Sequence, residues 1–154
     1  MSATLAVSAV RQRIAAVVEA LASPAAWTES GWPYGAFPAA EPGQDAHLTF
    51  AVGVPSTSFA THIETSRTTR AANGGAAHTD VRVAWLFALA SDGEVSDVDG
   101  ALDAEQLLIT ALVGTAHTSG LHVYVEGATR QVVGDGTYLL GEVRLATTHR
   151  IAIQ

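Results

Sequence analysis

Six histidines and one His-Thr-Asp segment are the residues of this sequence whose types first suggest chemistry. The histidines at 47, 62, 78, 117, 122 and 149 form no His-x-His or HExxH pair, the spacings typical of a zinc site. His78 and Asp80 could perform acid/base work, but no G-x-S-x-G motif supplies a nucleophile. The residues therefore predict no catalytic site, no bound metal and no cofactor.

Two further segments have the composition of ligand loops. The stretch from Ser91 to Gly100 is acidic, but no alignment gives the acid, glycine and glutamate positions of a calcium loop. Acids just ahead of a helix satisfy its free N–H groups, and we assign them that role. Gly74-Gly75 and Gly134-x-Gly136 do not open helices after strands, so no phosphate loop is predicted.

A loop from Ser66 to His78 holds two arginines, Arg67 and Arg70, and the turn signal Asn73-Gly74. Loops of this length tend to be functional or mobile. The arginines could bind phosphate or a partner's carboxylates, or they could be solvated at a loop tip. The residues alone leave both interpretations open.

The segment 23–46 combines many prolines and glycines with four aromatic residues, Trp27, Trp32, Tyr34 and Phe37. Its composition excludes long regular structure. Disordered linkers are poor in aromatic residues, so we expect an irregular loop packed on the body or on a neighbour. An aromatic ligand pocket is the alternative.

Hydrophobic periodicity predicts the elements that position these loops. Stretches with a 3.6-residue period indicate helices, and alternating stretches indicate strands. The predicted order is a helix at 4–22, strands at 47–54, 56–63 and 79–90, a helix at 101–113, and strands at 121–126 and 137–153. The segment 127–136 is a predicted connection. The fold class is α+β, a mostly antiparallel sheet of about four to five strands with two helices packed on it, in one domain spanning 1–154.

The stretch Thr79 to Ala90 is predicted to be the central strand. Val81, Val83, Trp85, Phe87 and Leu89 share one face, while much of the other face is apolar too. A small domain rarely has enough helices of its own to cover both faces of a sheet. A neighbouring chain is therefore expected to cover part of it.

Composition points the same way. Charged residues make up 15% of the chain, against about a quarter in an ordinary soluble domain. Self-association would cover the surface that charges otherwise keep hydrated. The formal charge of −7 makes tight binding of DNA or RNA unexpected. No apolar run reaches the about 20 residues of a membrane span, and the first 25 residues lack the basic start of a signal peptide.

In layout the chain resembles the tail terminator (tail completion) proteins of tailed bacteriophages and related prophage particles. The resemblance rests on the order of the elements across nearly the whole chain. The matching features are the helix 5–21, the aromatic loop 27–37, the strand pair 47–63, the Arg/Gly loop before VRVAWLFAL at 81–89, the helix 101–113 and the pattern GDGTYLLGEVRLA at 134–146.

The resemblance implies a homohexameric ring at the neck-proximal end of the tail in the virion, assembled in the host cytoplasm. Its partners would be the tail tube protein and the head–tail connector, with DNA passing through the lumen without specific binding. The rival interpretations are another neck or head-closure adaptor, or a small ligand-binding domain or enzyme. We expect the subunit or partner interface to use six charged residues, Arg67, Arg70, Asp80, Arg82, Glu142 and Arg144.

Overall fold

In the computed structural model the described residues are 5–22, 27–29, 48–59, 75–89, 95–114, 120–133 and 138–151. They form two helices and five strands. In chain order these are α1 (Val7–Glu19), β1 (Thr28–Glu29), β2 (Leu48–Phe59), β3 (Gly75–Ala88), α3 (Val95–Gly114), β4 (Leu121–Val133) and β5 (Tyr138–Ile151).

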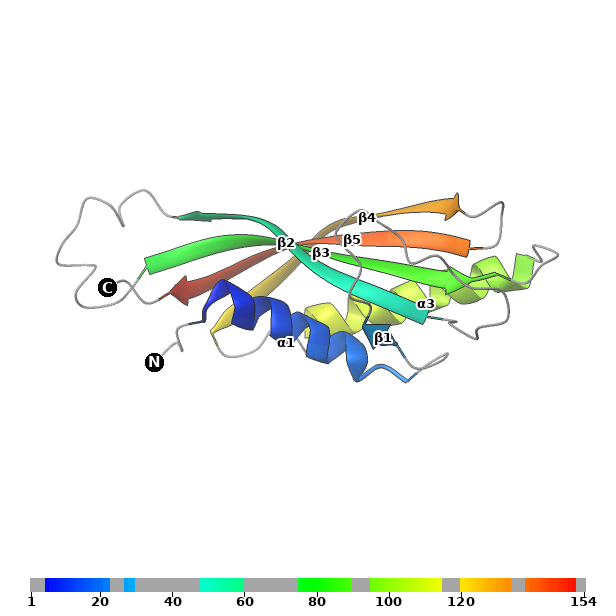
Figure 1. Cartoon of the computed structure of the whole chain (residues 1–154), viewed down its shortest axis with the longest axis horizontal. Helices are drawn as coiled ribbons and strands as arrows, with labels where there is room; N and C mark the ends of the chain where they lie inside the picture. Colours follow the sequence, from blue (N-terminus) through cyan, green and yellow to red (C-terminus); the bar gives the residue numbers. More distant parts are fainter. Residues whose placement is uncertain are drawn as a thin grey trace.

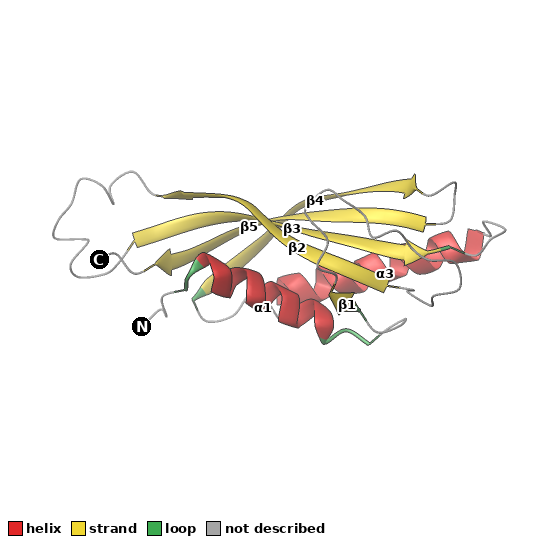
Figure 2. Cartoon of the chain, viewed as in Figure 1, coloured by secondary structure: helices red, strands yellow, loops and turns green. Residues whose placement is uncertain are grey.

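The strands make one twisted sheet in the order β1-β2-β3-β5-β4 (Figure 1). β1 pairs parallel with β2, and the other neighbours are antiparallel. Both helices lie on the same side of this sheet (Figure 2), where α1 packs against β2 and α3 packs against β4 and β5. The predicted α+β class is confirmed, and the stretch predicted to be central is the middle strand, β3.

Alternation in the strands divides the sheet into two faces, as their two-residue period requires. Val81, Val83 and Trp85 of β3 are fully buried beneath the helices. Each helix contributes a hydrophobic stripe to the same layer, in which Ile14 of α1 and Leu108 of α3 are also fully buried. The core is therefore a single layer between one sheet face, which we call the inner face, and the two helices. The opposite face, which we call the outer face, is covered by neither helix.

Trp85 lies flat against the backbone of the neighbouring strand. Its cross-strand partner on β5 is Gly141, and a Cβ atom added there would lie 2.0 Å from Trp85 Cε2. No real side chain fits at that separation, so glycine is the residue that allows the indole ring to occupy this space. The central core position thus depends on two residues, one from each of the two middle strands.

Two register shifts flank the middle strands at the same level. On β2, Val54 and Pro55 lie opposite Val81, and on β4, Glu126 is the extra residue beside Leu145. Proline is tolerated in a sheet at a bulge, because its missing N–H leaves no ladder bond broken there. Bulges also increase local twist, and in the view of Figure 1 the twisted strands overlap near the middle of the sheet.

These shifts correct two of the predicted strand boundaries. We expected Pro55 to separate strands at 47–54 and 56–63, but β2 continues through it to Phe59. We also expected β4 to end at Glu126, with a connection at 127–136, but it continues to Val133. In both cases one extra residue was absorbed by a bulge, which reverses the alternation and makes the pattern look interrupted.

Several other ends differ from those predicted. α1 is shorter than 4–22, and β3 begins at Gly75, inside the segment predicted as a loop. α3 is longer than 101–113, because its first turn and a half come from the acidic segment that was expected to precede the helix. β1 pairs within the stretch predicted to be irregular, and the nearby Trp27 is buried. The remaining aromatic residues of that stretch lie outside the described residues.

A buried polar network ties the start of α1 to the sheet. The Nδ1 of His149 bonds to the carbonyl oxygen of Leu5 at 2.9 Å, and its Nε2 lies 2.8 Å from Thr79 Oγ1. A carbonyl can only accept, so Nδ1 carries the proton. Thr79 also contacts Thr57 Oγ1 at 3.1 Å, and its carbonyl accepts a bond from Thr147 Oγ1 at 2.8 Å. The N-terminal segment is thereby fixed through a buried histidine.

No helix within the described ranges has both the length and the hydropathy needed to cross a bilayer.

Substituting Gly141→Ala should destabilise the fold, because the new methyl group overlaps the Trp85 ring. We expect a loss of about 3 kcal/mol in the free energy of unfolding, measured by urea denaturation. Gly114→Ala is the matched control, since a Cβ atom there meets nothing within 4 Å. If both variants unfold at the same urea concentration as the wild type, the indole does not occupy the space above Gly141.

Thr79→Val should remove the hydroxyl that bonds to His149 while keeping the shape of the side chain. The His149 ring would keep one partner and lose the other, at a cost of about 1–3 kcal/mol. The measurement is the free energy of unfolding together with amide exchange in α1, which should become faster at its first turn. Thr129→Val, on an exposed position of β4, should change stability by less than about 0.5 kcal/mol.

Candidate functional site

The outer face of the sheet carries most of the charged residues that the sequence singled out. β2, β3, β5 and β4 each contribute one residue to successive rows across it. The first row, at the end near the start of α3, is Thr49, Leu86, Leu140 and Gln131, and the second is Ala51, Ala84, Glu142 and Thr129. The third row is Gly53, Arg82, Arg144 and Gly127. The fourth is Ser56, Asp80, Ala146 and Tyr124, and the fifth is Ser58, His78, Thr148 and His122.

The third row places two arginines side by side between two glycines. Arg82 and Arg144 are cross-strand partners, an arrangement in which like charges repel. Arg82 is offset by Glu142, with Nη1 and Oε1 3.9 Å apart and side chains 41% and 31% exposed. A pair this long and this exposed contributes little to stability. We call Arg82 and Arg144 the arginine row.

Arg144 differs from its neighbour. It is exposed, and its guanidinium lies over Gly127, where an added Cβ would be 3.0 Å from Nη2. Within the described ranges of the chain, Arg144 makes no ion pair. Glycine on the edge strand therefore leaves room for the Nη2 end of this guanidinium.

The other predicted interface residues lie partly on the outer face and partly outside the described residues. Asp80 lies one row further along the outer face, where it accepts a 2.6 Å hydrogen bond from Ser56 Oγ. His78 is exposed on the same face, two residues before it. Arg67 and Arg70 lie outside the described residues. The structure thus brings Arg82, Arg144 and Glu142 together and places Asp80 beside them.

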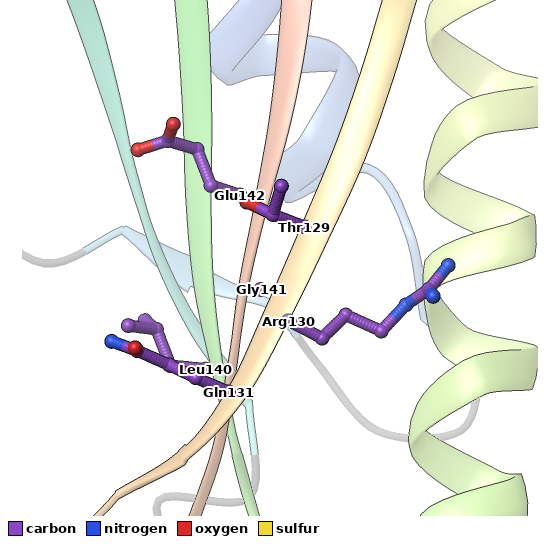
Figure 3. A pocket seen from close by; sticks show the side chains of 6 residues that line it. All are labelled: Thr129, Arg130, Gln131, Leu140, Gly141 and Glu142. Atoms are coloured by element: carbon purple, nitrogen blue, oxygen red, sulfur yellow. The ribbon is translucent and has the colours of Figure 1, made fainter.

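A small depression follows the β4–β5 pair (Figure 3), with a volume of about 200 Å³. Pockets that enclose drug-sized ligands are usually larger, about 300–1,000 Å³. Its lining side chains diverge: Arg130 points to α3, whereas Glu142 lies on the other side of the strands. No group of three or more His, Cys, Asp or Glu residues in the described ranges is placed to hold a metal ion.

Arg130 makes the one ion pair among the described residues that reaches a fully buried acid. Its Nε lies 2.8 Å from Glu105 Oε1, and its Nη2 contacts the same oxygen. Glu105 is 2% exposed, and its Oε2 has no hydrogen-bond partner within the described structure. Arg130 thus supplies the charge that compensates a buried carboxylate, and it joins the edge strand β4 to α3.

This ion pair was not predicted from the sequence, although the pattern around one of its two residues could have indicated it. Glu105 falls in the α3 stripe between Ala101 and Leu108, at the spacing of a buried helix position. Arg130 could not be found, because the segment that holds it was predicted to be a connection. Tyr124 was also not selected, and it is one of the large exposed hydrophobic residues of the outer face.

With this geometry in place, comparison with known proteins shows a structural likeness to solved chains. No protein-family model matches the chain, and no curated protein matches its sequence. A chain in the solved virion of a native gene transfer agent (GTA) particle matches with a TM-score of 0.53 and 16% sequence identity. The match covers 93% of this chain and 92% of that chain. The two chains therefore share a fold over nearly their whole lengths, and membership of the tail terminator family stays a prediction.

Two exposed arginines of the sheet should differ sharply when replaced. Arg130→Ala leaves the buried Glu105 carboxylate uncompensated and should lower the free energy of unfolding by about 2 kcal/mol or more. Arg144→Ala removes no internal ion pair of the described structure and should change it by less than about 0.5 kcal/mol. Thermal and urea denaturation of the two variants in parallel measure this difference. Equal losses would mean that Arg144 has a structural role within the chain.

Proposed function

We propose that this chain is a structural virion protein that closes the end of a phage tail tube as a ring of six copies. In this role it ends tail elongation and forms the surface to which the head–tail connector binds. Its work is steric and needs no chemical step. The ring occupies the growing end of the tube and lacks the surface that the next tube subunit would need.

The observation that carries this proposal is the whole-length likeness to a chain of a GTA virion. Because the match covers nearly the whole of both chains, it favours a component of similar size and shape. It supports a structural role in a virion. The narrower assignment to the tail end rests on the sequence resemblance in the order and spacing of elements.

The placement of both helices on one face of the sheet supports assembly into a ring. The outer face, which neither helix covers, has buried Leu86 and Leu140 at one end and charged or small side chains beyond them. Tyr124 is 55% exposed there. Aromatic residues and arginines are enriched where protein surfaces meet. With a charged fraction of only 15%, the chain has the composition of a protein that covers part of its surface with other copies.

The net charge of −7 suits a ring through which DNA passes. Phosphates are repelled by a surface with an excess of carboxylates, so DNA moves past it without being held. The proposal accordingly includes no specific nucleic-acid site.

The proposal predicts that the purified protein forms closed rings of six copies, alone or on isolated tail tubes. Mass photometry should show a species of six times 15.9 kDa, and negative-stain electron microscopy should show a ring with a central channel. Deletion of the gene from the phage or prophage genome that encodes it should give overlong or headless tails.

Two outcomes would count against this function. Tails of normal length joined to heads after the deletion would remove the terminator role. A ring located by electron microscopy at the head side of the neck would indicate a head-closure adaptor.

A further inference from the structure

A closed ring joins two different patches of each copy, because head-to-tail contacts repeat around the circle. This inference deepens the proposed function and rests on it: it concerns which two patches of the chain meet. Each patch must complement the other in charge and shape.

The first patch is the arginine row with the residues beside it. Arg144 places its Nη2 next to Gly127 and makes no ion pair within the described ranges. Tyr124 lies in the adjacent row and is 55% exposed. An arginine without an ion pair in the described part of the chain, beside an exposed aromatic ring, is typical of residues that carry binding energy.

The second patch is on α3, on the other side of the sheet. Asp99 and Asp103 are both exposed and are four residues apart, so they share one side of the helix. Leu107, a further four residues along and 42% exposed, extends the same side, and exposed Leu102, three residues after Asp99, borders that side on its other edge. We call these four residues the acidic helix patch. It pairs carboxylates with exposed apolar side chains, as the first patch pairs guanidinium with Tyr124.

The two patches cannot meet within one chain. α3 packs on the inner face of the sheet (Figure 1), whereas the strand register puts the arginine row on the outer face. Glu142 and Asp80 are poorer partners for a neighbour's arginines, since Glu142 faces Arg82 and Asp80 bonds to Ser56 within the chain. Charge complementarity therefore selects a second copy of this chain, and its acidic helix patch, as the occupant of the arginine row.

We infer that, in the ring, the arginine row of each copy binds the acidic helix patch of the next, with Arg144 facing Asp99 and Asp103. Tyr124 packs against Leu102 and Leu107 in the same contact. The interface is heterologous and uses opposite sides of the molecule, which is the arrangement that a closed head-to-tail circle requires.

Site-directed crosslinking tests the contact directly, because the chain has no cysteine of its own. A chain carrying both Arg144→Cys and Asp103→Cys, treated with a short bismaleimide, should give a ladder of covalent oligomers that ends at six. A bismaleimide is used because the backbones of a salt-bridged pair lie too far apart for a disulfide. The control pairs Arg150→Cys with Asp103→Cys: Arg150 is exposed on the same strand and face, about 20 Å from Arg144. A ladder no stronger than that of the control overturns the inference.

Charge reversal tests the energetics of the same contact. Arg144→Glu and Asp103→Arg should each raise the concentration for half-assembly by about tenfold or more, because like charges would face each other around the ring. An equimolar mixture of the two variants should assemble as the wild type does, because each altered charge then faces an altered partner. Failure of the mixture to recover, with both variants folded by circular dichroism, overturns the inference.

Assembly of the wild-type protein distinguishes failure of this inference from failure of the proposed function. If wild-type rings form and Arg144→Glu assembles normally, the contact is wrong and the ring stands. If the wild type stays monomeric with and without tail tubes, the proposed function fails, and the contact fails with it. If Arg144→Glu assembles normally and binds duplex DNA more weakly than the wild type, the arginine row faces DNA, and the inference is overturned.

Discussion

Trp85 lies over the bare backbone of Gly141, and the rest of the fold is arranged around that contact. Phe50, Trp85, Gly141 and Arg130 form one inner row across the four long strands. The indole ring of Trp85 fills the centre of this row, so no side chain is tolerated at position 141 beside it. Arg130 ends the row and reaches Glu105 of α3. Sheet and helix are thus joined where the core is most tightly packed.

That packing gives the two faces of the sheet different tasks. The inner face holds the buried side chains, the His149 network and the ion pair to α3. The outer face contributes little to the core that the helices enclose, so its side chains can serve other contacts. Arginines, glycines and small apolar residues alternate there without breaking the fold. The role that we propose, as part of a larger particle, uses such a division, because the outward surface must fit a neighbour.

Periodicity in the sequence was sufficient for the class of fold, the central strand and the burial of Val81, Val83 and Trp85. It failed where one residue too many enters a strand, at Pro55 and Glu126, because a bulge changes the face on which later residues lie. The interface residues were chosen by charge alone. Their grouping depended on the cross-strand register that puts Arg82 beside Arg144, and single-sequence patterns do not contain that register. The role of Gly141 depended on the same register.

The two bulges lie at one level, on either side of the middle pair of strands. They divide a long sheet into two shorter panels that face different directions, with the arginine row at the seam. A subunit bent in this way can present one panel sideways and the other along an axis. In the ring that we propose, circumferential and axial contacts would come from the same five strands, and the angle between the panels would help to determine how many copies complete a turn.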